Sequence, residues 1–230
     1  MRQSIFEIKS NTALTKTVYK MELKGDVSDI TSSGQFVNIK LDGFYLRRPI
    51  SVNDCENGIL TIIYKVVGKG TEQMAKMQAG EKLDVLTGLG NGYDLSLSGD
   101  KPVLLGGGVG VPPLYMLCKK LIAEGKKVSV ILGFNTKDEV FCEEDFKKLG
   151  ADVYVTTADG SYGIKGFVTD ALKDIDYSYF YTCGPEPMLK AVFKSTNTSG
   201  QFSFEERMGC GFGACMGCSC KTITGYKRIC

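Results

Sequence analysis

The sequence contains no histidine and no tryptophan among its 230 residues. Without histidine there is no serine–histidine pair, no histidine-ligated zinc and no imidazole to act as a general base, so enzymes that depend on these groups are excluded. A chain of this composition that performs chemistry is expected to take it from a cofactor.

A strong net charge and long apolar runs are also missing. The formal net charge is +2, which gives no electrostatic reason to expect a nucleic acid or a membrane surface as partner. The longest apolar stretch, around residues 103–117, is interrupted by glycine and proline and is too short to span a bilayer. Glu7 and Lys9 interrupt any apolar core of a signal peptide. We therefore expect a globular protein with neither a nucleic-acid nor a membrane partner.

Nine cysteines are present, an odd number, and five of them lie between residues 210 and 230. This arrangement does not resemble a secreted disulfide framework and favours a metal site in the reducing cytoplasm. Cys210, Cys215, Cys218 and Cys230 follow the spacing C-x4-C-x2-C with a distant fourth cysteine, the plant-type ligand pattern of a [2Fe–2S] cluster. A structural zinc site is the alternative, although zinc sites usually pair two short C-x2-C hairpins.

The first part of the chain has the pattern of a small antiparallel β-barrel. Short runs that mix β-branched or aromatic residues with polar ones predict strands over 4–10, 15–22, 35–41, 60–66 and 82–86. Turn signals between them include Asn53-Asp54 and Glu56-Asn57-Gly58. One short helix is expected over residues 71–77, with Thr71 as its N-cap.

From Gly99 onward the pattern changes to strands that alternate with helices. Strands are expected over 103–105, 127–134, 152–156 and 177–183, and helices over 112–123, 143–149, 166–172 and 185–194. Such alternation predicts a doubly wound parallel sheet with helices on both faces. The sequence therefore predicts a multi-domain β plus α/β protein: an antiparallel β-barrel over 1–98, an α/β domain over 99–200 and a cysteine segment over 201–230.

Two loops of the α/β part suit a dinucleotide. Gly106–Gly110 follows a strand and opens a helix, where backbone N–H groups and the helix dipole can receive a pyrophosphate. Val111 stands where the strict fingerprint has its third glycine, so a tight turn without a ligand is about as good an interpretation of this loop alone. Cys183-Gly184-Pro185 ends another strand of the same sheet, so its loop is expected on the same side as the glycine loop.

Two segments of the barrel suit a diphosphate. Arg47-Arg48-Pro49-Ile50-Ser51 places two permanent cations and a hydroxyl on a strand or its edge, and arginine is the best side chain for a bidentate grip on phosphate. A solvated basic pair is the alternative. Tyr64–Thr71 leads from a strand through a glycine turn into a helix N-terminus, again suited to phosphate. Tyr64 itself is alternatively part of the barrel core.

Together these motifs resemble a known family. Arg48–Ser51 (R-P-x-S) and Tyr64–Thr71 (Y-x-V-V-G-x-G-T) resemble the FAD-binding domain of the ferredoxin–NADP reductase superfamily. Gly106–Pro113 and Cys183–Pro185 resemble its nicotinamide-binding domain. Glu206–Cys220 is similar to one branch in particular, the electron-transfer (K) subunits of type 1B dihydroorotate dehydrogenase. The sequence departs from the superfamily where Thr87-Gly88 replaces a common Gly-Pro dipeptide.

The resemblance implies which residues hold each cofactor. For FAD it implies Arg48 on the pyrophosphate, Ser51 near the reactive edge of the flavin ring, and further contacts from Pro49, Ile50, Ile63, Tyr64, Lys65, Gly70 and Thr71. For NAD(H) it implies Gly107, Gly108, Gly110, Cys183, Gly184 and Pro185. For the [2Fe–2S] cluster it implies Cys210, Cys215, Cys218 and Cys230. No side chain is expected to act as a catalytic acid or base.

The resemblance also implies a function. The chain would be the NAD-linked oxidoreductase subunit that passes electrons between NAD+ and an FMN-containing dihydroorotate dehydrogenase catalytic subunit, in pyrimidine (UMP) biosynthesis. FAD belongs between the other two centres because it exchanges electrons both in pairs and singly. A heterotetramer with two copies of each subunit is expected. NAD rather than NADP rests on the resemblance, because residues 133–137 show neither an arginine pair nor a plain acidic residue.

Two alternatives remain at this point. The first is the flavin and [2Fe–2S] subunit of an NADH-dependent reduced ferredoxin:NADP oxidoreductase or of a sulfide dehydrogenase, which share the barrel, the dinucleotide domain and the cysteine tail. The second is a redox-inert interaction module that binds zinc. Colour separates the second from the rest, since a zinc protein without flavin is colourless.

Overall fold

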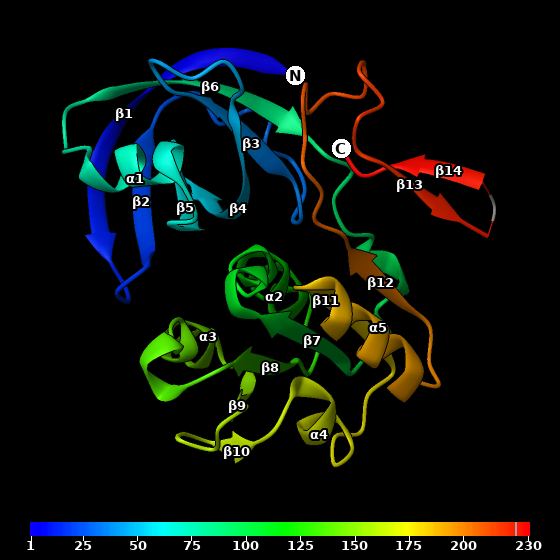
Figure 1. Ribbon diagram of the computed structural model, residues 1–230. Helices are drawn as coiled ribbons and strands as arrows, with labels where there is room; N and C mark the ends of the chain where they lie inside the picture. The colour runs from blue at the N-terminus through cyan, green and yellow to red at the C-terminus, as the bar shows by residue number, and fades with distance from the viewer. Residues whose placement is uncertain (224) are drawn as a thin grey trace. The chain divides into compact units, whose positions relative to one another are not determined.

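The structure is a computed structural model and describes residues 1–223 and 225–230 (Figure 1). Contacts divide the chain into two compact units. One unit contains Met1–Gly92 together with Glu205–Cys230, and the other contains Tyr93–Phe204. The cysteine segment at the end of the chain therefore packs with the beginning of the chain.

The first unit is built on a closed antiparallel barrel with the strand order β1-β2-β5-β4-β3-β6. Burial in β6 alternates, with every second residue from Leu83 to Leu89 inside, as expected for a strand with one face on the core. The strands are β1 (Arg2–Ala13), β2 (Val18–Lys24), β3 (Phe36–Lys40), β4 (Arg48–Glu56), β5 (Ile59–Lys65) and β6 (Lys82–Leu89). The predicted barrel is confirmed.

Two local predictions in the barrel are wrong. Asn53-Asp54 is not a turn but lies inside β4, at a register shift between Val52 and Asp54, because pairing with β5 continues past these polar residues. Thr71 is not an N-cap: helix α1 (Lys69–Lys76) begins after Gly68. From inside the helix the Thr71 hydroxyl accepts hydrogen bonds from the backbone N–H groups of Val67 and Gly68, at 2.9 and 3.2 Å.

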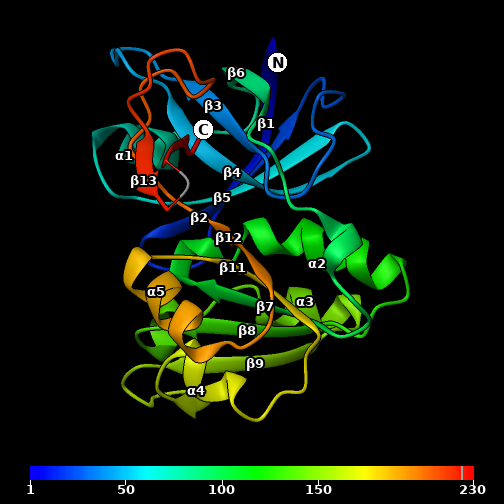
Figure 2. The ribbon, with the colours of Figure 1, turned by 90° about the vertical axis from the view of Figure 1, so that its right-hand side faces the viewer.

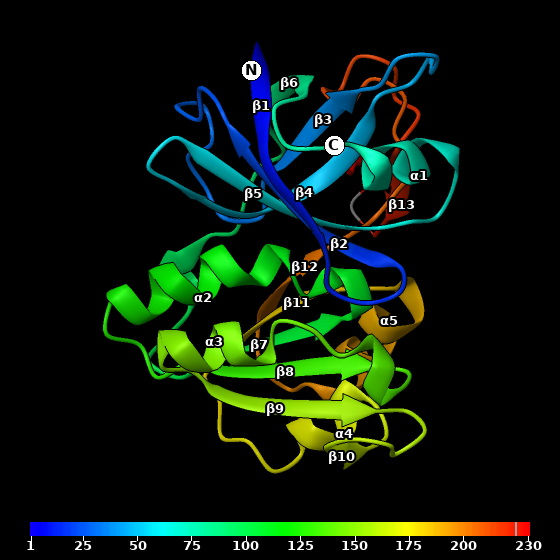
Figure 3. The ribbon, with the colours of Figure 1, turned by 90° about the vertical axis from the view of Figure 1, so that its left-hand side faces the viewer.

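The second unit has a six-stranded parallel sheet with the order β10-β9-β8-β7-β11-β12 (Figure 3). Its strands are β7 (Pro102–Gly107), β8 (Ser129–Phe134), β9 (Asp152–Thr157), β10 (Ile164–Lys165), β11 (Tyr179–Cys183) and β12 (Gly200–Ser203). The central strands β7 and β11 are buried along their whole length, as strands covered on both faces must be.

Two pairs of helices cover this sheet on its opposite faces (Figure 1). They are α2 (Pro113–Ala123) with α3 (Glu143–Leu149), and α4 (Val168–Leu172) with α5 (Glu186–Ser195). Three short 3-10 turns, η1 (Leu95–Leu97), η2 (Gly108–Gly110) and η3 (Lys137–Glu139), lie between these elements. Within residues 1–223 and 225–230 no helix is long and apolar enough to cross a membrane.

The cysteine segment ends in a small antiparallel sheet of β13 (Ser219–Thr222) and β14 (Gly225–Arg228), with Ser219 paired to Arg228. The Arg228 guanidinium donates a hydrogen bond of 2.7 Å to the carbonyl of Gly213, which ties this sheet to the loop that carries the first cysteines. Figure 2 shows the segment beside the barrel.

Candidate functional site

The guanidinium of Arg48 lies over the first turn of helix α1. A Cβ atom on Gly70 would be 2.2 Å from Arg48 Nε, so only glycine permits this approach. The guanidinium also stacks on the Phe44 ring at 4.4 Å from its centroid and donates to the carbonyl of Leu46. The first-turn N–H groups of a helix have no partner within the helix and attract anions. Arg48 and the start of α1 thus fit a diphosphate.

Arg47, the neighbouring arginine, has a different role. Its Nη1 atom lies 3.0 Å from the carboxylate of Asp84 on β6 and donates to the backbone carbonyls of Asn38 and Asp84, at 3.2 and 3.1 Å. Both side chains of the ion pair are less than one fifth exposed. Arg47 therefore holds the barrel strands together, whereas its neighbour Arg48 lies beside the start of α1.

The other expected FAD contacts lie on β4 and β5. Pro49, Ile50 and Ser51 are partly exposed on β4, Lys65 is exposed at the end of β5, and Ile63 is buried. Tyr64 is 2 % exposed and stacks on Tyr19 at 5.9 Å, and its hydroxyl donates to Asn11 Oδ1 at 3.0 Å. Burial raises the pKa of Tyr64 to about 12, although the bond to Asn11 opposes the shift.

The glycine loop and the Cys183-Gly184-Pro185 turn are in direct contact. Strands β7 and β11 pair in parallel with Gly106 opposite Cys183, so both loops leave the same edge of the sheet. A Cβ atom on Gly110 would lie 2.3 Å from the Cys183 carbonyl oxygen, and one on Gly184 would lie 3.2 Å from the Gly107 nitrogen. The expectation that these two loops lie side by side is confirmed.

Above this contact the loop is open. Gly108 has φ +53°, which favours glycine, and a Cβ atom there would meet nothing within 4 Å. By contrast, Gly107 faces the side chains of Met188 and Pro185, which leave no room for a side chain at this position. The open backbone at Gly108 fits a ligand that approaches the loop closely, as a dinucleotide does.

The four cysteines of the predicted cluster approach one another in two pairs. The backbone N–H of Cys215 donates to Cys210 Sγ at 3.4 Å, and the backbone N–H of Cys230 donates to Cys218 Sγ at 3.4 Å. No group of three His, Cys, Asp or Glu side chains within the described parts of the chain converges on a point that would hold one metal ion. Two pairs of thiols fit a two-iron cluster, which takes four thiolates in all.

Backbone hydrogen bonds also lower the pKa of two of these thiols, Cys210 and Cys218. N–H groups of Cys215 and Phe212 stabilise the thiolate of Cys210 and lower its pKa to about 6. Burial opposes ionisation of Cys218, but hydrogen bonds from the backbone and thiol of Cys230 bring the pKa of Cys218 below its ordinary value. Burial and the Cys218 thiol raise the pKa of Cys230. Since thiolates are the metal-binding form, the loop favours a cluster at Cys210 even at neutral pH.

Asn38 on β3 belongs to the candidate site but is not predicted from the sequence. Its side-chain amide donates to the backbone carbonyl of Cys210 at 3.2 Å, which links the barrel to the cysteine loop. The available signal was a polar residue in the middle of the apolar run Phe36-Val37-Asn38-Ile39, all of which is buried.

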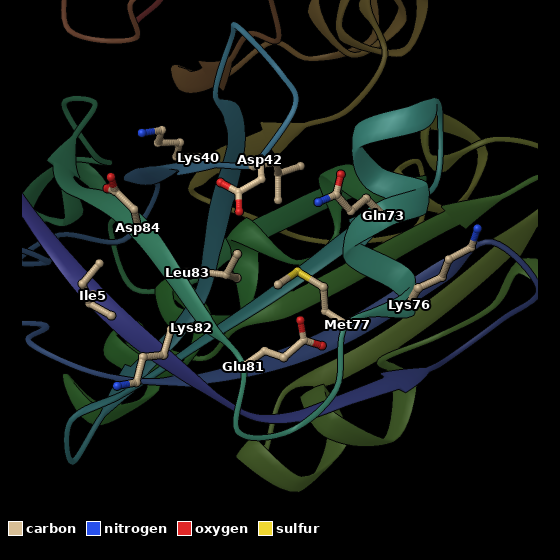
Figure 4. A pocket seen from close by; sticks show the side chains of 11 residues that line it. Ile5, Lys40, Asp42, Gln73, Lys76, Met77, Glu81, Lys82, Leu83 and Asp84 are labelled. Carbon is tan, nitrogen blue, oxygen red and sulfur yellow. The ribbon is translucent and has the colours of Figure 1, made fainter.

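A separate cavity of about 450 Å3 opens on the barrel, next to the second half of α1 (Figure 4). It is lined by three lysines, three acidic residues, four apolar side chains and one glutamine: Lys40, Lys76, Lys82, Asp42, Glu81, Asp84, Ile5, Leu41, Leu83, Met77 and Gln73. Since its charges balance and none of the expected site residues lines it, we do not assign this cavity to a cofactor.

Comparisons with known proteins agree with this geometry. Residues 104–194 match the oxidoreductase NAD-binding domain, and residues 205–230 match the iron–sulfur cluster binding domain of dihydroorotate dehydrogenase B. The electron transfer subunit of dihydroorotate dehydrogenase B (NAD(+)) from Fusobacterium nucleatum is 47% identical over 97% of this chain and 92% of its own length. The subunit of the same name from Bacillus pumilus is 44% identical over 100% of this chain and 94% of its own length.

This chain belongs to the dihydroorotate dehydrogenase B (NAD(+)) electron transfer subunit family. Among solved structures, the NADH-dependent reduced ferredoxin-NADP oxidoreductase has a TM-score of 0.88 with 30% identity over 98% of this chain and 85% of that one. A ferredoxin NADP+ reductase from Neisseria gonorrhoeae, 17% identical with a TM-score of 0.75 over 89% of this chain and 100% of that one, shows the shared fold.

Membership in the dihydroorotate dehydrogenase B electron transfer subunit family confirms the family expected from the sequence and its function as an NAD-linked oxidoreductase subunit. The matched domains and the shared fold agree with the expected cofactors FAD, NAD(H) and a [2Fe–2S] cluster.

Proposed function

We propose that this subunit carries electrons between NAD+ and the FMN of a dihydroorotate-oxidising catalytic subunit, in an assembly with two copies of each chain. The observation that carries the proposal is the pairing of Cys210 with Cys215 and of Cys218 with Cys230 in a loop that packs on the barrel. When bound, FAD exchanges a hydride's electron pair with the nicotinamide and single electrons with the cluster. The protein supplies position and electrostatics.

The barrel segment, residues 1–98, would hold FAD. Arg48 and the N–H groups of Gly70 and Thr71 would bind its pyrophosphate, because a permanent cation and a helix N-terminus meet there. Ser51 would lie at the reactive edge of the flavin ring, and the contacts would continue along the two strands through Pro49, Ile50, Ile63, Tyr64 and Lys65. Since Tyr64 is buried and its hydroxyl donates a hydrogen bond to Asn11, its side chain would hold β5 in position.

The α/β segment, residues 99–200, would receive NAD(H). The open backbone at Gly108 would admit the dinucleotide, while Gly107 and Gly110 let the loop pack on Cys183, Gly184 and Pro185. Cys183 is 1 % exposed, so its thiol would border the nicotinamide site and would not be a nucleophile. Residues 201–230 would hold the cluster through Cys210, Cys215, Cys218 and Cys230.

The surface around the cysteines supports the proposed partner. Four large apolar side chains are at least half exposed there, on the cysteine loop and the β13–β14 hairpin: Phe212, Met216, Ile223 and Tyr226. Large apolar side chains that are exposed along one segment of a protein make that segment a candidate interaction site. We propose that the catalytic subunit covers this surface, which would bring its flavin toward the cluster. The odd number of cysteines, with five of the nine between residues 210 and 230, supports a metal site in a reducing cytoplasm.

Co-expression with dihydroorotate-oxidising catalytic subunits, followed by anaerobic purification, tests the proposal. The complex is expected to contain iron, FAD and FMN and to reduce NAD+ when dihydroorotate is added. A complex that contains all three cofactors but forms no NADH would contradict the proposed function. Co-purification with a large iron–sulfur protein in place of the catalytic subunit would favour the ferredoxin-linked alternative, to which the structural likeness also points.

A further inference from the structure

Asn38 is a buried residue of the barrel that contacts the cysteine loop, which we call the cluster loop from here on. It is 1 % exposed in β3, and its Nδ2 atom donates to the carbonyl oxygen of Cys210 at 3.2 Å. Its Oδ1 atom is buried and has no hydrogen-bond partner among residues 1–223 and 225–230. An unsatisfied buried acceptor destabilises a fold, so an apolar side chain of similar size would suit the barrel better. The amide is therefore explained by its contact with the loop and not by the barrel.

The loop is shaped to receive this side chain. A Cβ atom on Gly211 would lie 2.8 Å from Asn38 Nδ2 and 3.6 Å from the ring of Phe36. Gly211 also has φ +78°, a conformation that favours glycine. The residue after the first expected ligand thus lies directly on the surface formed by Asn38 and Phe36.

The same surface continues to the expected flavin contacts. In the β3–β4 ladder Asn38 is opposite Pro49, and Phe36 is opposite Ser51. Side chains of directly opposed residues lie on the same face of a sheet, with Cβ atoms about 5 Å apart. Asn38 and Phe36 therefore lie between the strand assigned to the flavin and the loop assigned to the cluster.

We propose that Asn38 is a positioning residue that fixes the cluster loop against the strand next to the flavin. The inference rests on the proposed function, because it assigns the loop to a [2Fe–2S] cluster and β4 to FAD. Asn38 contacts neither reacting centre. It acts through the backbone of Cys210, in the way that outer hydrogen bonds orient metal ligands.

The test compares Asn38→Leu with Asn53→Leu in the complex with the catalytic subunit. Asn53 is a matched control, because it is a buried asparagine of the same barrel whose Oδ1 atom also lacks a partner in the described chain. For Asn38→Leu we expect iron release to a chelator about 10-fold faster than in wild type, a changed electron paramagnetic resonance spectrum after dithionite reduction, and unchanged FAD content. Asn53→Leu is expected to match wild type in all three measurements.

Gly211→Ala disturbs the contact between Asn38 and the loop from the loop side and leaves β3 unchanged. It therefore tests the role of this contact if Asn38→Leu does not fold. Faster iron release and a changed spectrum in Gly211→Ala support the proposal. Iron release and spectra equal to those of Asn53→Leu in every folded variant would overturn it. A wild-type complex without iron or without flavin would instead overturn the proposed function, so the two failures are distinguishable.

Discussion

Gly110 and Cys183 meet backbone to backbone, at a distance that leaves no room for a side chain. A methyl group on Gly110 would lie 2.3 Å from the Cys183 carbonyl oxygen and 2.7 Å from the Cα atom of Gly184. Two loops that are 73 residues apart in the sequence are thereby fixed as one surface at the edge of the parallel sheet.

Two substitutions in the Gly106–Gly110 loop are expected to have different effects, one on the stability of the protein and the other on its affinity for NADH. Gly110→Ala introduces a backbone clash and should lower the free energy of unfolding by about 1–3 kcal/mol. Gly108→Ala meets only open space, so it should cost about 1–2 kcal/mol for its positive φ while its methyl group blocks the dinucleotide. Urea unfolding and NADH titration of both variants measure this. Normal NADH affinity in Gly108→Ala would contradict the assignment of the loop.

Alanine substitutions of the adjacent residues Arg47 and Arg48 are expected to affect different properties, namely the stability of the barrel and the affinity for FAD. Arg48→Ala should weaken FAD binding by about 1.5–3 kcal/mol, the worth of hydrogen bonds to a charged group, with little change in the stability of the FAD-free protein. Arg47→Ala should lower the stability of the barrel by a similar amount, about 1.5–3 kcal/mol, because it removes the ion pair to Asp84 and two hydrogen bonds to carbonyls. FAD titration and urea unfolding distinguish the two. Equal FAD affinity of Arg48→Ala and wild type would count against the diphosphate site.

Serine substitutions identify the cluster ligands. Replacement of Cys210, Cys215, Cys218 or Cys230 should remove most of the iron and the visible absorption of the cluster, because thiolates are its ligands. Cys220→Ser is the control in the same segment and is expected to keep wild-type iron. Iron and inorganic sulfide analysis after anaerobic purification checks this, and loss of iron in Cys220→Ser alone would mean that Cys220 is a ligand.

Tyr64 is expected to make stability depend on alkaline pH. Burial raises its pKa to about 12, above the ordinary value of about 10, so the folded state favours the neutral phenol. Its contribution is therefore complete below about pH 10 and is lost as the pH rises through about 12. The stability difference between wild type and Tyr64→Phe should shrink over that range. The other buried tyrosines are common to both proteins and cancel. A constant difference from pH 9 to pH 12, measured by urea unfolding, would contradict this account.

The apolar surface around the cysteines is expected to bind the catalytic subunit. Ile223→Asp should weaken the complex by about 10-fold or more, because an unpaired carboxylate would be buried at the interface. Ile164→Asp, at an exposed isoleucine on β10 of the other unit, is the matched control and should bind like wild type. Analytical ultracentrifugation of the reconstituted complex measures both. If the two variants bind equally well, the interface lies elsewhere.

Where local sequence signals agreed with the fold, the predictions were accurate. Helix α3 occupies the predicted residues 143–149, because acidic residues fill its first turn and Gly150 ends it in the left-handed conformation. Where pairing between distant segments decides, the predictions were wrong or incomplete. Asn53-Asp54 has the composition of a turn, but pairing with β5, which places Asp54 opposite Thr61, keeps it in β4. Strand β12 was not predicted because its four residues are held by pairing with β11.

The candidate site shows the same division. Cysteine spacing alone predicts the cluster loop, since the first three expected ligands lie within nine residues. The approach of Arg48 to Gly70 and the contact of Asn38 with Cys210 join segments 22 and 172 residues apart, and no local pattern encodes them. Resemblance to a family assigned Arg48 and Gly70 to the same cofactor, but the two contacts themselves are seen only in the structure.

The return of Glu205–Cys230 to the unit that begins at Met1 has a consequence for biogenesis. During synthesis the barrel strands emerge first, but the loop that Asn38 contacts is made only after the α/β unit. In the sequence, the α/β unit (Tyr93–Phe204) stands between the two segments of the barrel unit, so it is synthesised before Glu205–Cys230. Iron delivery to the expected ligands would therefore follow synthesis of the α/β unit, and a nascent chain stalled before residue 205 contains none of Cys210, Cys215, Cys218 and Cys230.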